Sequence, residues 1–275
     1  MSKILEIKNL TKYYGKTKGV EELSLSLNEG EIFGFIGPNG AGKSTTIRSI
    51  MKLINYDGEI ERTDNIGYLP CEVSLYGNYK ISELFEFHQK IYKKDMNKKI
   101  NYLCKQLSIN KEKKISELST GNLKKVAIVL SLAHDPKLII MDEATSGLDP
   151  IIQEKFYDIL KKEKENGNTI LFSSHNLNEV KKIADRIGII KEGKLIDIKN
   201  INEIDNNEIC YVTIYTDDEI LINKYKSEYD GKKIKLSYKD NINKLIQELS
   251  KHKIKKLLIE EPSLEDIFML YYKEE

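Results

Sequence analysis

The sequence lacks any long apolar run, and this absence limits the kinds of protein that it can encode. No apolar stretch approaches the roughly 18 to 20 residues that a membrane-spanning helix requires. The first ten residues, MSKILEIKNL, also lack the apolar centre of a signal peptide. We therefore expect a soluble cytoplasmic protein with no signal or transmembrane segment.

The sequence also has few cysteines and almost no net charge. Cys71, Cys104 and Cys210 lie far apart, with no CxxC pair and no zinc-ligand spacing, so we expect a reducing compartment and no disulfide framework. The 44 basic and 43 acidic residues leave a formal charge of +1, which provides no overall basic field for nucleic acid. Lysine-dense pieces such as KIYKKDMNKK alternate with acidic and apolar residues, which indicates solvated helix faces. We therefore expect no nucleic-acid partner.

The length and the 40% apolar content allow one large domain, or a large domain with a small one. A polar stretch after about residue 200, NINEIDNNE, is typical of a linker. We predict a large domain over residues 1–200 and a small accessory α/β domain over residues 201–275. In the small domain, alternating patterns predict three strands, EICYVTIY, KIKLSY and KKLLIEE, a helix at NINKLIQELS, and a last helix beginning at Pro262 and Ser263.

The large domain begins with strand-like alternation over its first 36 residues, which predicts an antiparallel hairpin that leads into a buried strand at EIFGFIG. A helix with Ile47, Ile50, Met51 and Ile54 on one face should follow. KLIIMDE and TILFSSH are short apolar runs separated by a helical pattern, as in parallel strands buried on both faces. DRIGIIKEGKLIDI predicts a closing hairpin, and a mostly helical insert spans about residues 72–136.

The glycine-rich stretch GPNGAGKS matches the pattern G-x-x-x-x-G-K-[ST] in full. Glycines allow successive backbone N–H groups to point inward at the positive end of the next helix, which creates a site for an anion. Lys43 should reach the β- and γ-phosphates, and the Ser44 hydroxyl should bind Mg²⁺. We predict a nucleoside triphosphate site made by Gly37, Pro38, Asn39, Gly40, Ala41, Gly42, Lys43, Ser44 and Thr45.

Acidic residues follow the apolar strand LIIMDE, where the ligands of open α/β sheets bind. We expect Asp142 to hold Mg²⁺ through water, and Glu143 to orient or deprotonate the attacking water. His175 closes the strand TILFSSH at the same edge, where it could hydrogen-bond the γ-phosphate or the water. A lone histidine is more often structural, but this one is placed at that edge by the strand order and not by its residue type alone.

Four motifs in this order, GPNGAGKST, LSTGN, IIMDEATSGLD and SSH, resemble those of the ATP-binding subunit of ABC transporters. The resemblance covers residues 3 to about 198 closely, and the tail more loosely. It implies an α/β fold of the P-loop NTPase class, with a parallel-sheet core, an N-terminal antiparallel β subdomain, an inserted helical subdomain and a small C-terminal α/β appendage. It also implies that Tyr14, rather than its neighbour Tyr13, stacks on adenine.

The resemblance further implies that ATP binds between two such subunits. LSTGN, with Ser119, Thr120, Gly121 and Asn122, would cap the γ-phosphate of the partner subunit's ATP, and Asp149 would lie in a loop that signals between subunits. ATP binding would close the dimer and hydrolysis at Glu143 would reopen it, driving integral membrane permease subunits from the cytoplasmic face. EEPSLEDIFMLYY, with the Cys71-Glu72 pair, resembles a subfamily that exports drugs, antibiotics or antimicrobial peptides through separate permeases.

Three departures from the family pattern leave alternatives open. Cys71 and Glu72 occupy the region of the usual glutamine ligand to Mg²⁺, and Glu72 could replace it or contact the membrane subunit. Thr120 stands for glycine and Asn122 for glutamine, so we predict a functional but non-optimal half-site. Ala144 replaces a proline, which we expect to matter little.

The sequence leaves other functions and roles open to comparison with these. A soluble ATPase of the same superfamily, acting on ribosomes or nucleic acid, would be expected to carry two phosphate loops, or a coiled-coil or zinc insertion, which this sequence lacks. A regulator that does not hydrolyse ATP is opposed by the intact Glu143 and His175. Tyr14 could be only a strand-end aromatic, and Asp149 could serve as a helix N-cap, a role compatible with signalling. The appendage is expected to pack or to stabilise a dimer rather than to sense a ligand.

Overall fold

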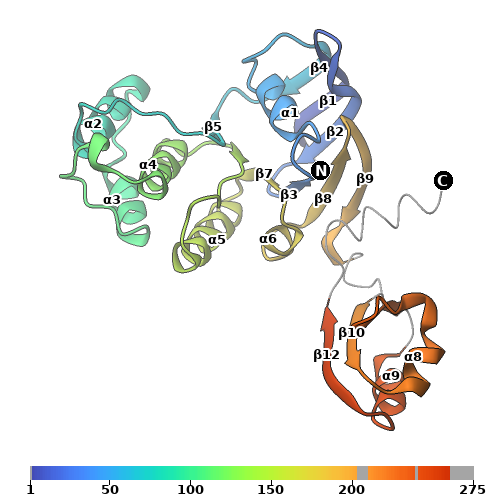
Figure 1. Cartoon of the computed structure of the whole chain (residues 1–275). Coiled ribbons are helices and arrows are strands. Elements are labelled where there is room, and N and C mark those ends of the chain that lie inside the picture. Colours follow the sequence, from blue (N-terminus) through green and yellow to red (C-terminus); the bar gives the residue numbers. More distant parts are fainter. Residues whose placement is uncertain (1, 203–209, 239–240, 261–275) are drawn as a thin grey trace. The chain divides into compact units, whose positions relative to one another are not determined.

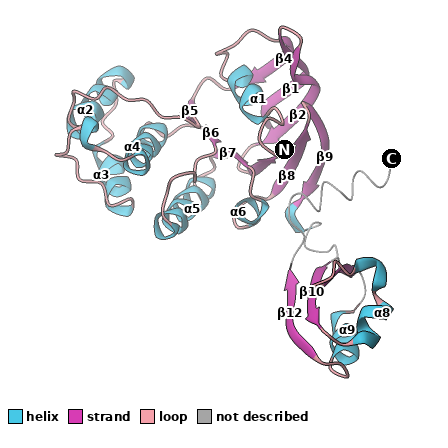
Figure 2. Ribbon diagram, in the orientation of Figure 1, coloured by secondary structure: helices cyan, strands magenta, loops and turns pink. Residues whose placement is uncertain are grey.

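The computed structural model describes residues 2–202, 210–238 and 241–260. The chain forms two compact units, Met1–Ile201 and Asn202–Glu275. The large unit contains an antiparallel sheet, a mostly parallel sheet and a group of helices (Figures 1 and 2). In the described ranges, no helix is both long enough and apolar enough to cross a bilayer.

The antiparallel sheet consists of β1 (Lys3–Tyr14), β2 (Thr17–Asn28) and β4 (Asp57–Arg62), in the order β2-β1-β4. It confirms the hairpin predicted from the first 36 residues. Alternate side chains of β1 and β2 are buried against the parallel sheet in one shared core, and they include Leu5, Ile7, Leu23, Leu25 and Leu27. Polar residues occupy the positions between them, as expected for a sheet with one covered face.

The second sheet has six strands in the order β5-β6-β7-β3-β8-β9. Its members are β3 (Ile32–Ile36), β5 (Ile66–Leu69), β6 (Leu138–Asp142), β7 (Thr169–Ser174), β8 (Arg186–Lys191) and β9 (Lys194–Asn200). All pairs are parallel except β8 with β9. Every residue of β3, β6 and β7 is buried, which explains their continuous apolar runs. Since these three strands are parallel neighbours, the segments that follow them emerge at one edge.

Helices of the large unit either flank this sheet or form the insert. The first group is α1 (Lys43–Ile50), α5 (Pro150–Glu165) and α6 (Leu177–Lys181), and the insert holds α2 (Ile81–Tyr92), α3 (Asn97–Gln106), the short 3₁₀ helix η1 (Ile115–Glu117) and α4 (Thr120–Ala133). Figure 1 shows α2, α3 and α4 gathered away from the antiparallel sheet. The prediction that Ile54 extends α1 was wrong, because the helix ends at Ile50, Lys52 turns to φ 57°, and the Arg62 Nε atom donates a hydrogen bond to the Ile50 carbonyl at 2.7 Å.

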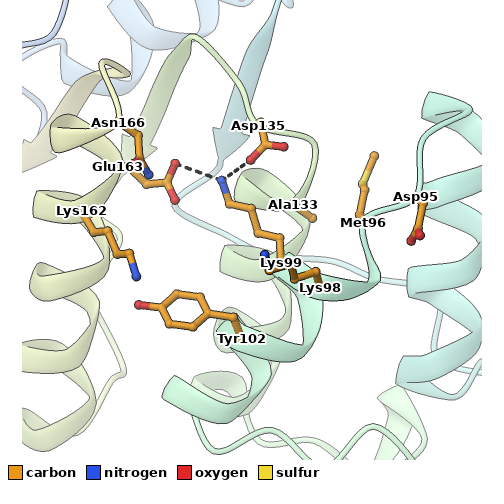
Figure 3. Close-up of a pocket in the computed structure, with 10 residues that line it drawn as sticks. All are labelled: Asp95, Met96, Lys98, Lys99, Tyr102, Ala133, Asp135, Lys162, Glu163 and Asn166. Atoms are coloured by element: carbon orange, nitrogen blue, oxygen red, sulfur yellow. Dashed lines mark hydrogen bonds and ion pairs between the residues drawn. The ribbon is translucent and has the colours of Figure 1, made fainter.

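The helical insert is tied to the core by side chains of α3 and α5 (Figure 3). Lys99 of α3 pairs with Asp135 at 2.6 Å and with Glu163 of α5 at 3.1 Å. The Lys162 ammonium lies 4.5 Å from the ring centroid of Tyr102. A cavity of about 430 Å³ lies at this junction. Because Glu163 is buried and Lys99 is its cationic partner, separating α3 from α5 would leave a carboxylate without a counter-ion.

The small unit has a three-stranded antiparallel sheet in the order β11-β10-β12, packed against two short helices. It contains β10 (Cys210–Thr216), α8 (Glu219–Lys224), η2 (Lys226–Glu228), β11 (Ile234–Tyr238), α9 (Ile242–Leu249) and β12 (Ile254–Glu260). The predicted strands and the predicted helix α9 are present. Helix α8 was not predicted, because its six residues are too few for a clear period; Asp218 caps its first turn. The helix predicted from Pro262 lies outside the described residues.

Two histidines, the buried His134 and the half-buried His88, pack together in the insert, and the Nε2 atom of His134 lies 3.1 Å from the Ile66 carbonyl oxygen of β5. His88 of α2 and His134, which follows α4, have ring centroids 5.8 Å apart, and Tyr92 stacks on His134 at 4.3 Å. The Nε2 atom of His88 and the Nδ1 atom of His134 are buried without a hydrogen-bond partner among the described residues. Burial lowers the pKa of His88 to about 4, aided by the nearby His134, and burial also lowers the pKa of His134. Both rings are therefore neutral in the folded protein at neutral pH.

This arrangement predicts that acid destabilises the large unit. The folded-state pKa of His88 lies below its ordinary value of 6.5, so stability from the neutral ring is complete above that value and is lost as the pH falls toward about 4. The midpoint of thermal unfolding, measured between about pH 7.5 and about pH 5, should fall less for His88→Phe than for the parent protein. His252→Phe, in the small unit, is the control and should preserve the parent's pH dependence for the large unit. An equal fall in His88→Phe and the parent would contradict the assignment.

Candidate functional site

A cavity of about 320 Å³ lies where the phosphate loop meets the ends of β1 and β6. It brings together residues from five separate segments: Tyr14, Lys18, Gly19, Asn39, Gly40, Gly42, Lys43, Ser44, Thr45, Cys71 and Glu143. Most residues predicted to bind the nucleotide, and the predicted catalytic carboxylate, therefore share one cavity. Gly37, Pro38 and Ala41 do not line it, but they shape the loop.

The phosphate loop joins β3 to α1 and adopts conformations that require glycine. Gly40 and Gly42 have φ angles of 80° and 111°, and a Cβ atom on Gly42 would lie only 2.7 Å from the Gly19 carbonyl oxygen. Gly42 also serves as the N-cap of α1 without any side-chain cap. The first N–H groups of α1 therefore have no capping side chain at the positive end of the helix, where an anion is favoured.

Lys43 is the cation of this loop and is only 5% exposed. Its Nζ atom donates hydrogen bonds to the carbonyl oxygens of Gly37 at 2.7 Å and Pro38 at 3.2 Å. The turn is closed by the Ala41 N–H, which donates to the Pro38 carbonyl at 3.1 Å. The loop thus wraps around its own lysine and holds the ammonium at the cavity wall.

Tyr14 lies at the mouth of the cavity, whereas Tyr13 does not line it. The Tyr14 side chain is 45% exposed, and a Cβ atom on Gly19 would meet its ring at 3.0 Å, so the two residues pack closely. Tyr13 instead donates its hydroxyl to the Glu21 carboxylate at 2.5 Å. Of the two tyrosines, only Tyr14 lines this cavity, and its stacking on a base stays a prediction.

The acidic pair at the end of β6 is held by β7. Ser173 donates its hydroxyl to the Asp142 carboxylate at 2.8 Å and accepts a hydrogen bond from the Glu143 N–H at 3.1 Å. Asp142 is buried, and Glu143 has a φ angle of 50°, in the left-handed region. A residue with a Cβ atom is uncommon in this region. The backbone reverses there and directs the Glu143 side chain to the cavity.

The Glu143 carboxylate lies between two side chains predicted to act with it. One oxygen is 3.3 Å from the Lys43 Nζ atom, and the other is 2.7 Å from the Nδ1 atom of His175. The His175 side chain is 56% exposed, whereas Glu143 and Lys43 are largely enclosed. The structure therefore brings together Lys43, Glu143 and His175 from the segments that follow β3, β6 and β7, three parallel strands.

The residues LSTGN lie outside this cavity. Ser119 is the N-cap of α4 and accepts a hydrogen bond from the Asn122 N–H at 3.4 Å, which favours Ser119 over Thr120 as the capping residue. Asp149 caps α5 in the same way, through the Ile152 N–H at 3.0 Å, with Pro150 in the first turn. The N-cap interpretation of Asp149 is therefore correct, and its role between subunits stays a prediction.

Several residues of the site were not predicted from the sequence. Lys18 and Gly19 line the cavity, and Ser173 hydrogen-bonds both Asp142 and Glu143. This serine, inside the apolar run TILFSSH, was the one feature of the sequence that could have indicated this role. Lys124 of α4 is buried beside Glu143.

Of the pair whose roles were left open, Cys71 lines the cavity and Glu72 does not. Burial raises the pKa of the Cys71 thiol, and the neighbouring Asp142 adds to this effect.

Comparisons with known proteins agree with this geometry. The family model "ABC transporter" matches residues 20–146. An uncharacterized ABC transporter ATP-binding protein of Methanocaldococcus jannaschii is 38% identical over 82% of this chain and 92% of its own length. The bacitracin transport ATP-binding protein BcrA of Bacillus licheniformis is 31% identical over 98% of this chain and 97% of its own. A bacterial ABC transporter cassette solved as a dimer has a TM-score of 0.66 and 27% identity, and covers 72% of this chain and 98% of that one.

Each of these three matches covers more than nine-tenths of the other protein: 92%, 97% and 98% of its length. The predicted phosphate-loop fold is confirmed. Most of the phosphate loop lines the same cavity as the Glu143 carboxylate, which pairs with Lys43. The chain therefore belongs to the ATP-binding subunits of ABC transporters, and it is an ATPase.

Proposed function

We propose that this chain powers an exporter, in which two ATP-binding subunits close over ATP and drive a separate membrane permease. The observation that carries the proposal is the placement of the Glu143 carboxylate between Lys43 and His175. Export is supported by the relative named for bacitracin transport, which matches 98% of this chain. The same relative favours transport over the soluble alternative that acts on ribosomes or nucleic acid. The permease would hold the chain at the cytoplasmic face of the membrane.

The contacts of Lys43 suggest how ATP engages the catalytic residue. Lys43 is paired with Glu143 at 3.3 Å, and phosphate oxygens in the loop would compete for the same ammonium. Transfer of Lys43 to the phosphates would leave Glu143 held by His175 alone, free to accept a proton from the attacking water. Tyr14, at the mouth of the cavity, would stack on the base.

The residues present also fit Mg²⁺. Ser44 offers a hydroxyl at the cavity and Asp142 a carboxylate, oxygen donors of the kind that Mg²⁺ prefers. The Glu143 oxygen that pairs with Lys43 at 3.3 Å is buried and accepts no hydrogen bond from the described residues. No cluster of three metal-ligating side chains occurs in the described part of the chain. Mg²⁺ in nucleotide sites is usually held by only one or two protein ligands together with substrate phosphates. Ser44 and Asp142 would hold the ion, which would neutralise phosphate charge.

The dimer is supported by the position of LSTGN. Ser119, Thr120, Gly121 and Asn122 line no part of their own chain's cavity, yet they begin α4, whose first N–H groups favour an anion. A similar cassette forms a dimer. We infer that these residues cap the γ-phosphate bound by the partner subunit, and that Asp149 lies close to this contact.

A permease contact is supported by an exposed aromatic patch between the Cys71 loop and the insert. Tyr76, Tyr79 and Phe87 are exposed, and with Leu84 they line a cavity of about 150 Å³. Large apolar side chains gathered on a surface mark an interaction site, and aromatic residues are favoured there. Since the patch follows Cys71 and Glu72 in the sequence, the permease would reach the ATP site through this loop.

Glu143→Gln tests the catalytic assignment. The amide keeps the shape of the side chain but cannot accept the proton, so turnover should fall by about a hundredfold or more while ATP still binds. Phosphate release should be nearly lost, and size-exclusion chromatography with ATP should show an accumulated dimer. Lys43→Ala is the matched control, which should lose ATP binding and form no such dimer. Normal phosphate release by Glu143→Gln would contradict the assignment.

Thr120→Gly tests the half-site at LSTGN. Removing a β-branched side chain where the partner's nucleotide approaches should raise the ATPase rate of the isolated subunit. The unfolding temperature should be measured alongside, because glycine in the first turn of α4 lowers helix stability by up to about 1 kcal/mol. An unchanged rate would show that Thr120 does not limit the half-site, although it would leave the dimer model intact.

A further inference from the structure

Lys124 is a buried lysine next to the catalytic carboxylate. It lies on α4, four residues after the helix begins, and is only 4% exposed. Removing an ammonium from water is unfavourable unless other groups replace its hydrogen bonds. A lysine on the buried face of α4 therefore needs strong hydrogen-bond acceptors. An apolar residue would pack there at a lower cost in free energy.

Its acceptors belong to the loop that follows β6. The Lys124 Nζ atom donates hydrogen bonds to the carbonyl oxygens of Glu143 at 2.7 Å and Ser146 at 3.2 Å. Among the described residues, no carboxylate lies within ion-pair distance of this ammonium. Lys124 thus hydrogen-bonds the backbone of the loop from Glu143 to Gly147, and one of the two bonds is to the proposed base itself.

Glu143 is held from both sides of its peptide backbone. Its N–H donates to Ser173 of β7 at 3.1 Å, while its carbonyl accepts from Lys124 of α4 at 2.7 Å. The left-handed conformation of Glu143, with a φ angle of 50°, is unfavourable for a residue with a Cβ atom. Such a conformation persists when its surroundings hold it, and these two hydrogen bonds come from different elements.

A second contact joins the same two segments. A Cβ atom on Gly121 would lie 2.4 Å from the Gly147 carbonyl oxygen, so the first turn of α4 lies directly against the loop. Gly121 and Lys124 are three residues apart and lie on one face of the helix. The start of α4 and the loop from Glu143 to Gly147 are therefore in contact at two successive positions.

We propose that Lys124 is a positioning residue that couples the LSTGN end of α4 to Glu143 of the same chain. Any movement of α4 that follows capture of the partner's nucleotide would reach the Glu143 backbone through this ammonium. Each chain would then align its own base when its LSTGN motif engages ATP on the other chain. The inference rests on the proposed dimer and on the proposed role of Glu143.

The test compares Lys124→Met and Lys124→Gln with the parent protein. Lys124→Met removes the donor and should lower kcat by about tenfold to a hundredfold, with KM for ATP and equilibrium ATP binding changed less than about twofold. Lys124→Gln keeps one amide donor and should lose less. Lys125→Met, on the neighbouring lysine, is the matched control and should keep the parent's kcat. An unchanged kcat in both Lys124 variants would overturn the proposal, and so would a raised KM with an unchanged kcat.

A double variant shows whether Lys124 acts through Glu143. If it does, Lys124→Met combined with Glu143→Gln should turn over ATP no more slowly than Glu143→Gln alone in a single-turnover assay. A further loss equal to that of Lys124→Met alone would overturn the proposed route. Hydrolysis by the parent and its slower rate in Glu143→Gln are measured in the same series. They test the proposed function separately, whatever the Lys124 variants show.

Discussion

The backbone reversal at Glu143 is the constraint on which the rest of the site depends. It turns the chain at the end of β6 so that the carboxylate meets Lys43 at 3.3 Å and His175 at 2.7 Å. The reversal is unfavourable by itself, and Ser173 and Lys124 hold it through the N–H and the carbonyl of the same residue. The position of Glu143, the proposed base, is thus set jointly by a neighbouring strand and by a helix of the insert.

This arrangement makes the helical insert part of the catalytic apparatus. The insert is anchored to the core through Lys99, which pairs with Asp135 and with Glu163 of α5, and it is packed through His88 and His134. Its helix α4 then carries LSTGN at one end and Lys124 one turn later. In the proposed cycle, ATP capture at the partner's site would act on Glu143 of this chain through α4 and Lys124.

Much of the fold and of the nucleotide site could be predicted from the sequence, because continuous apolar runs reveal buried parallel strands and the phosphate loop requires a fixed spacing. The strand order then places Glu143 and His175 at the same edge. The roles of Ser173 and Lys124 could not be predicted, since each depends on a contact between elements that are distant in the sequence. A lysine in a helix pattern indicates a solvated face, and only the packing of α4 against the loop shows that Lys124 is buried. Helix α8 was missed because six residues show no clear period.

The central claim is that two chains share each nucleotide, and the most direct measurement is a structure of Glu143→Gln bound to ATP and to its permease. We predict that Ser119 and Gly121 of one chain contact the γ-phosphate held by the partner subunit's Lys43, with two nucleotides per dimer. A closed ATP-bound complex in which Ser119 and Gly121 touch no nucleotide would contradict it.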